Sequence, residues 1–185
     1  VAARPMQAPE SALIADVDQM LAHVTDRTRI VFLANPNNPT GSLLPASEVR
    51  RLHAGLSPST LLVLDAAYAE YVTDPDYSPG VDLVDAAQNV VMARTFSKIY
   101  GLAALRVGWA YCSGPVADVL NRIRNPFNVP LPAQVAATAA VRDQEHVARV
   151  RAYTVEKRDW LAGELTAMGL VVHPSHGNFL LVDFP

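Results

Sequence analysis

Short apolar segments of the sequence end abruptly in polar or turn-forming residues, and stretches with helical periodicity separate them. Segments 30–34, 61–64 and 90–93 are almost wholly apolar, which is typical of buried strands in a parallel sheet. The helices expected between and after them span 45–56, 115–124, 133–141 and 146–168. This alternation predicts an α/β fold, with three layers (α/β/α) built on a mostly parallel sheet.

The remaining elements are expected near the two ends of the chain and beside the third strand. Apolar residues from Leu13 to Val24 recur at helical spacing, which predicts a helix over 11–24. A strand over 107–113 follows segment 90–93 closely enough to pair with it locally. Two further strands are expected over 170–173 and 178–184.

Composition excludes several classes of protein. With 50% hydrophobic and 18% charged residues among 185, the chain is globular rather than disordered. A net charge of −3 without a basic cluster argues against binding to nucleic acid or to an anionic membrane. Cys112 is the one cysteine, which excludes an internal disulfide and a cysteine-rich metal site; we expect a buried thiol there and no metal.

Polar residues gather where the predicted strands end, and ligands of parallel sheets bind at the carboxyl ends of the strands. Lys98 follows segment 90–93 together with Thr95 and Ser97, and Arg106 comes soon after. Lysine forms a Schiff base with an aldehyde cofactor, and an arginine fork suits a phosphate. A chance surface charge is the alternative interpretation of Lys98.

Two more candidates follow the first two strands. Asp65 comes directly after segment 61–64 and is either a helix N-cap or the partner of a protonated pyridine nitrogen. Tyr68, three residues later, either packs in the core or directs its hydroxyl to the same site. Asn38 lies in the turn-forming loop 35–41, whose prolines and glycine build a turn in any protein, but its amide is also suited to a ligand phenolate.

Taken together, these segments resemble the fold-type I, pyridoxal-phosphate-dependent aminotransferases of classes I and II. The matching motifs are Asn-Pro-Asn-Asn-Pro-Thr-Gly (35–41), Asp-Ala-Ala-Tyr (65–68), Thr-Phe-Ser-Lys-Ile-Tyr-Gly-Leu-Ala-Ala-Leu-Arg-Val-Gly (95–108) and Pro-Ser-His-Gly-Asn-Phe-Leu-Leu-Val (174–182). The resemblance covers essentially the whole chain. Within the family, segments 95–108 and 124–129 are most similar to the histidinol-phosphate aminotransferases.

The resemblance implies a role for each matching residue around pyridoxal 5′-phosphate. Lys98 would bind the cofactor covalently and move the proton between the substrate α-carbon and the cofactor. Asp65 would pair with the ring nitrogen, and Asn38 and Tyr68 would bind the ring 3-oxygen. The residues implied to hold the phosphate are Ser97 and Arg106, with Thr95. Ala66 and Ala104 depart from the family pattern, which commonly has Glu and Gly there.

The implied reaction is transamination from histidinol phosphate to 2-oxoglutarate in histidine biosynthesis, by a cytoplasmic homodimer. Alternatives within the group are an aromatic or general amino-acid aminotransferase and a threonine-phosphate decarboxylase. A non-catalytic aminotransferase-like module is the alternative of another class. A phosphate-loop nucleotide hydrolase is weaker, because the motif Gly-x-x-x-x-Gly-Lys-[Ser/Thr] is absent from the sequence.

Family members are longer, so we expect this chain to be part of a larger protein. The resemblance assigns residues 1–142 to part of the cofactor-binding large domain, and residues 143–185 to an interdomain helix and the first strands of the small domain. It also implies that an aromatic that stacks on the ring, a backbone contact to the phosphate and the arginine for the substrate carboxylate lie outside this chain. The implied activity therefore belongs to the intact protein.

Overall fold

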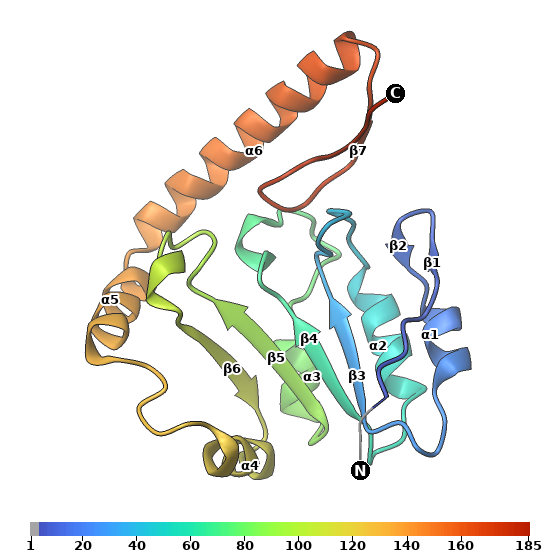
Figure 1. Ribbon diagram of the computed structural model, residues 1–185, viewed down its shortest axis with the longest axis vertical. Coiled ribbons are helices and arrows are strands. Elements are labelled where there is room, and N and C mark those ends of the chain that lie inside the picture. Colours follow the sequence, from blue (N-terminus) through green and yellow to red (C-terminus); the bar gives the residue numbers. More distant parts are fainter. Residues whose placement is uncertain (1–3) are drawn as a thin grey trace.

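The computed structural model describes residues 4–185 and confirms the α/β fold (Figure 1). Its main sheet has four strands in the order β3-β4-β5-β6. Strands β3 (Ile30–Ala34), β4 (Leu61–Asp65) and β5 (Val90–Thr95) are parallel. β6 (Gly108–Cys112) runs antiparallel to β5, as the short connection between them predicts. The carboxyl ends of the three parallel strands therefore lie together at one edge, here called the carboxyl edge.

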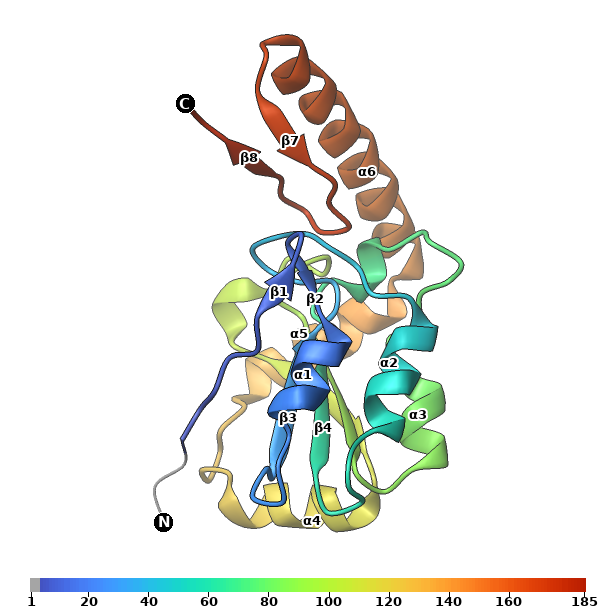
Figure 2. The same cartoon turned by 90° about the vertical axis from the view of Figure 1, so that its right-hand side faces the viewer.

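Three helices cover one face of this sheet: α1 (Val17–His23), α2 (Ala46–Ala54) and α3 (Val81–Ala86) (Figure 2). Their apolar side chains pack against alternate residues of the strands, and the resulting core contains Val17, Leu33, Val49, Leu52, Leu62, Leu64, Leu83, Val84, Val90 and Met92. On the opposite face of β3, the side chain of Phe32 is 70% exposed. Strand β3 is thus covered on only one face by the described residues, although its apolar sequence predicted burial on both faces.

The remaining helices lead from β6 to a terminal hairpin. α4 (Gly114–Ile123), α5 (Leu131–Arg142) and α6 (Gln144–Ala167) agree with the helices expected from the sequence. α6 extends beyond the carboxyl edge, and β7 (Val171–His173) and β8 (Leu181–Asp183) form an antiparallel pair beside it. The loop between β7 and β8 returns over the carboxyl edge in both views (Figures 1 and 2).

A second apolar cluster lies beneath that edge. It joins α5 and the start of α6 to the loops that follow β4 and β5, and its members include Tyr68, Phe96, Ile99, Tyr100, Val107, Ala133, Ala137 and Val147. Two short 3₁₀ helices belong to these loops, η1 (Ala69–Tyr71) and η2 (Ala103–Leu105). The loops that carry the candidate residues are therefore anchored by packing.

The single helix expected over 11–24 is wrong. Residues Glu10–Ser11 (β1) and Ile14–Ala15 (β2) form a small hairpin, and α1 begins only at Val17. Ala12 and Leu13 have φ angles of 49° and 65°, which a right-handed helix does not accommodate. Asp16 then starts the helix by accepting the Gln19 N–H at 3.0 Å, so an N-cap inside the periodic stretch marked the true boundary.

Two smaller expectations also need correction. Cys112 is half-buried rather than buried, because it lies on β6, an edge strand of the sheet. The strand expected over 178–184 is shorter and covers Leu181–Asp183, because residues 176–179 form a bend. In the described part of the chain, no helix combines the length and apolar character needed to cross a membrane.

Candidate active site

The loop after β3 places one asparagine in the protein interior and another at the carboxyl edge. Asn35 is buried, and its side-chain amide bonds both backbone groups of Leu44, at 3.0 Å to the carbonyl and 2.9 Å from the N–H. Both Asn–Pro peptide bonds of the loop are cis. Asn38 is exposed, and its Nδ2 donates to the hydroxyl of Tyr68 at 2.8 Å. Asn35 therefore shapes the loop, whereas Asn38 presents its amide to the edge.

Asp65 is the last residue of β4 and is exposed at the carboxyl edge. Its carbonyl accepts the Asn35 N–H at 3.0 Å, which ties the ends of β3 and β4 together. Its carboxylate Oδ1 accepts the Ala67 N–H at 3.1 Å. The N-cap of the following 3₁₀ helix is Tyr68, so the N-cap alternative for Asp65 is wrong: its side chain supports the turn and leaves the carboxylate at the edge.

Lys98 and Tyr68 face each other across two loops. Lys98 is half-buried in the turn after β5, and its Nζ lies 5.0 Å from the centroid of the Tyr68 ring. Tyr68 is buried, and Phe179 packs edge-on against it at 5.3 Å between ring centroids. Asn38, Tyr68 and Lys98 therefore form one connected cluster.

Hydroxyl groups and a guanidinium form a second cluster beside the first. Arg106 follows η2 with φ of 50°, and its Nη1 donates to the Ala103 carbonyl at 2.7 Å and to Ser97 Oγ at 3.4 Å. Thr95 Oγ1 accepts the Ser97 N–H at 3.0 Å. Both partners of the exposed Arg106 fork are neutral, which leaves its positive charge suited to a bound anion. Ala104 is exposed in η2, so its methyl is accommodated.

The seven residues singled out from the sequence therefore come together at the carboxyl edge. The arrangement offers a lysine amine and a phenol–amide pair on one side, a carboxylate at the neighbouring strand end, and an anion site that includes Ser97, the residue next to the lysine. A pyridine ring that carries an aldehyde, a hydroxyl and a phosphate matches this set of donors and acceptors group by group.

The loop between β7 and β8 packs onto the same edge. The His176 N–H donates to the Gly41 carbonyl at 2.8 Å, and Ser175 is buried against Gly41. Arg158 of α6 donates to the Gly177 carbonyl at 3.1 Å. Burial, and secondarily the positive charge of Arg158, lowers the pKa of the His176 imidazole. The terminal hairpin thus contacts the Asn38 loop directly.

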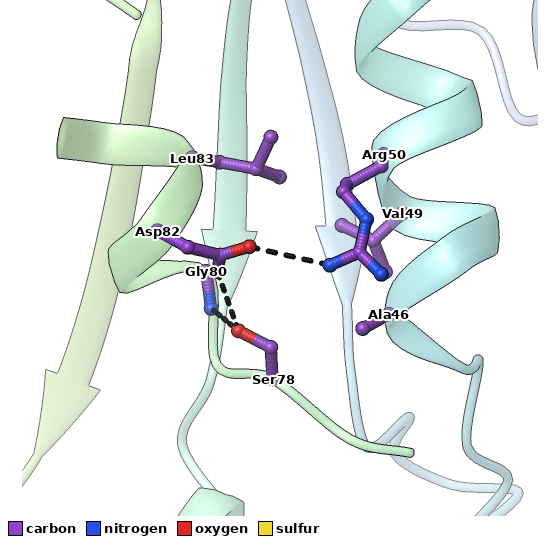
Figure 3. Close-up of a pocket in the computed structure, with 7 residues that line it drawn as sticks. All are labelled: Ala46, Val49, Arg50, Ser78, Gly80, Asp82 and Leu83. Atoms are coloured by element: carbon purple, nitrogen blue, oxygen red, sulfur yellow. Dashed lines mark hydrogen bonds and ion pairs between the residues drawn. The ribbon is translucent and has the colours of Figure 1, made fainter. Parts of the chain in front are cut away.

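Two hollows elsewhere lack this combination of groups. In the notch between α2 and α3, Asp82 accepts from both Arg50 and Ser78, and no room is left for a ligand (Figure 3). The second, of about 740 Å³, lies along the α4–α5 loop, lined by residues such as Arg124 and Phe127. Within residues 4–185 no three His, Cys, Asp or Glu side chains are grouped as metal ligands.

A set of charged residues beneath the site was not predicted from the sequence. Glu70 Oε1 accepts from Arg94 Nη2 at 2.7 Å, and Arg151 Nε donates to the Glu70 carbonyl. Each of these residues interrupts an otherwise apolar stretch or helix face, which is a weak signal of pairing. The partners of Glu70 are 24 and 81 residues away in the sequence, so only the fold reveals them.

Comparisons with known proteins agree with this geometry. The family model "Aminotransferase class I and II" matches residues 5–185. The chain is 58% identical over 182 residues to histidinol-phosphate aminotransferase of Rhodospirillum centenum, covering 98% of this chain and 50% of that protein. The crystal structure of histidinol-phosphate aminotransferase from Sinorhizobium meliloti in complex with pyridoxal-5′-phosphate superposes with a TM-score of 0.91 at 35% identity, covering 97% of this chain and 49% of that one.

A more distant similarity extends to L-threonine-O-3-phosphate decarboxylase from Porphyromonas gingivalis, with a TM-score of 0.72 and 25% identity over 91% of this chain and 52% of that chain. The chain spans about half the length of the relatives it matches.

Proposed function

Because this chain belongs to the class I and II aminotransferase family, we propose that the protein containing it transfers amino groups with pyridoxal 5′-phosphate bound at the carboxyl edge. The proposed reaction converts histidinol phosphate and 2-oxoglutarate into imidazole-acetol phosphate and glutamate. The observation that carries the proposal is the contact of Asn38 and Lys98 with Tyr68, beside the anion site at Arg106. The 58% identity to a histidinol-phosphate aminotransferase supports the choice of amino donor.

When bound, the cofactor supplies an electrophilic aldehyde carbon and a protonated ring that accepts electrons. Lys98 Nζ would hold the aldehyde carbon of the cofactor and, as a free amine once substrate is bound, would take the proton from the substrate α-carbon. Proton transfer occurs only over hydrogen-bond distances, so the lysine amine must be held in a fixed position. The half-buried turn after β5 and the contact with Tyr68 restrict the Lys98 side chain accordingly.

The other residues bind and orient the cofactor in this proposal. The Asp65 carboxylate accepts a hydrogen bond from the protonated ring nitrogen and keeps it protonated. Asn38 and Tyr68 donate to the ring 3-oxygen. Arg106 and Ser97 hold the phosphate, and Thr95 supports Ser97 through its backbone N–H.

We also propose the division of the chain into residues 1–142, within the cofactor-binding domain, and residues 143–185, the interdomain helix and the first strands of a small domain. The boundary coincides with Asp143, the N-cap of α6.

A homodimer is proposed as the functional assembly. The strongly exposed Ile123, Phe127 and Leu131 on the α4–α5 surface are consistent with an interface, and sedimentation equilibrium of the holoenzyme tests it.

The decarboxylase alternative shares the cofactor site and differs in the bond that is broken. Assays with histidinol phosphate, aromatic amino acids and threonine phosphate separate the alternatives, because transamination forms glutamate from 2-oxoglutarate whereas decarboxylation releases carbon dioxide. A preference for histidinol phosphate supports the proposed substrate. Carbon dioxide release from threonine phosphate without glutamate formation contradicts it.

The cofactor assignment is tested by adding pyridoxal phosphate to the purified protein and recording its absorbance spectrum. Reduction with borohydride then makes the covalent bond permanent, and peptide mass spectrometry locates the modified residue. A visible band with the label on Lys98 is expected. A label on Lys157 alone, or none, contradicts the assignment.

A further inference from the structure

A buried carboxylate, Glu70, lies between the loop that carries Tyr68 and the strand that leads to Lys98. It belongs to η1, two residues after Tyr68, and its side chain is 6% exposed. Its Oε1 accepts from Nη2 of Arg94 at 2.7 Å and from Nε at 3.3 Å. Arg94 is on β5, four residues before Lys98, and its side chain is 14% exposed. The pair therefore bridges the two segments whose residues meet at the cofactor site.

Both ends of the pair are held by further contacts. The Arg94 guanidinium lies 5.6 Å from the ring centroid of Trp109 on β6, in a cation–π arrangement. Arg151 of α6 donates from Nε to the carbonyl of Glu70. Glu70 thus joins β5 and α6 to η1, through its carboxylate on one side and its carbonyl on the other.

The tyrosines near Glu70 remain uncharged, so they do not neutralise its carboxylate. Burial, together with the negative charge of Glu70, raises the pKa of Tyr71 to about 12 and also raises the pKa of Tyr100. Both phenols therefore stay neutral at physiological pH. Arg94 is the cation that balances the buried carboxylate through a direct ion pair.

A buried ion pair is weak evidence for stability, because desolvation of the two charges offsets much of their attraction. Its directional contacts nevertheless fix the segments that carry them. We propose that Glu70 and Arg94 are positioning residues that set the Tyr68 hydroxyl and the Lys98 amine relative to each other. This proposal rests on the proposed function, because its consequence is the placement of the amine that reacts.

The test separates placement from stability by removing the pair in two ways. Glu70→Leu alone leaves the Arg94 charge buried and unpaired, and is expected to lower the unfolding midpoint strongly. The double variant Glu70→Leu/Arg94→Met replaces the pair with apolar side chains and is expected to regain most of the lost stability. Its kcat is nevertheless expected to stay roughly 10- to 100-fold low with KM little changed, because the amine is displaced. The matched control is Asp82→Leu/Arg50→Met, which removes an exposed pair and should leave kcat unchanged.

A readout without cofactor or turnover comes from the two lysines of the chain. Cofactor-free protein is labelled with a trace of acetic anhydride, and the ratio of acetylation at Lys98 to that at the exposed Lys157 is measured by mass spectrometry. A several-fold change of this ratio is expected in the pair variants but not in the control. Because this readout does not depend on the reaction, it stands even where the borohydride label fails to appear on Lys98.

Arg94→Lys serves where the double variant does not fold, since it keeps the charge but lacks the planar fork. Reduced kcat together with a changed labelling ratio in a folded protein supports the proposal. Recovery of kcat and of the labelling ratio along with stability, in either variant, overturns it and leaves the pair a purely structural contact.

Discussion

The carboxyl edge and the notch between α2 and α3 contain the same kinds of side chain and differ in how these are paired. In the notch, Arg50 Nη1 lies 3.3 Å from Asp82 Oδ2, and Ser78 donates to the same carboxylate at 2.7 Å (Figure 3). At the edge, the Arg106 fork meets a hydroxyl and a carbonyl, both neutral. Mutual neutralisation makes the notch a structural contact. An arginine whose partners are neutral keeps its positive charge available for an anionic ligand. The way the charged side chains are paired, and not their residue type, therefore distinguishes the binding site from the notch.

The largest contrast is expected between the two lysines. Lys98→Ala should lower turnover by about 10⁴-fold, the upper end of what a positioned acid–base group contributes, because the same amine also binds the cofactor. Lys157→Ala removes an exposed lysine paired with Glu156 and should leave turnover unchanged. Steady-state kinetics of both holoenzymes check this prediction. Near-normal turnover of the Lys98 variant would contradict the role proposed for the amine.

A smaller contrast is expected between two aspartates. Asp65→Asn should reduce kcat by about one to two orders of magnitude, because a charge-assisted hydrogen bond contributes roughly 1.5–3 kcal/mol and 1.36 kcal/mol is tenfold in rate. Asp82→Asn alters the exposed pair of the notch and should change kcat little and stability by less than ~1 kcal/mol. Kinetics and urea unfolding of both variants are the measurements. Equal effects on kcat would remove the distinction between the two regions.

Two glycines test the contact between the terminal hairpin and the carboxyl edge. Gly41 and Gly101 have φ angles of 74° and 70°, so alanine is strained at both positions, by about 1–2 kcal/mol. A Cβ at Gly41 also falls 2.8 Å from Ser175 Cα, whereas a Cβ at Gly101 has nothing within 4 Å. Gly41→Ala should therefore destabilise by about 1–3 kcal/mol more than Gly101→Ala in urea unfolding. An equal loss would mean that the hairpin does not pack on Gly41.

The smallest effect concerns pH. Because the pKa of His176 is lowered in the folded protein, the unfolded chain takes up this proton first as the pH falls. The stability associated with neutral His176 is therefore complete above the ordinary value of 6.5 and is lost as pH falls through the lowered folded pKa. His176→Asn should reduce the dependence of the unfolding midpoint on pH over this range, while His23→Asn, in the last turn of α1, provides the control. If the unfolding midpoint of the His176 variant depends on pH as steeply as that of the unmodified protein, the prediction is contradicted.

The sequence alone determined the α/β class, the order of the strands from β3 onward, the helices that follow β3 except α3, and the loops that carry the site. Those features are local: apolar runs make buried strands, and residues such as Asp65 and Lys98 follow directly where strands end. The sequence led to a wrong prediction for the helix over 11–24, because helical periodicity does not reveal a positive φ such as that of Leu13.

Only the tertiary structure decided which distant residues meet. Asn38 and Tyr68 are 30 positions apart, Glu70 and Arg151 are 81 apart, and Phe179 reaches Tyr68 from the terminal hairpin. Such contacts depend on strand order and on the path of α6, which no short window of sequence encodes. The sequence gives the chemical properties of each residue, whereas packing of the folded chain determines which residues lie close enough to act together.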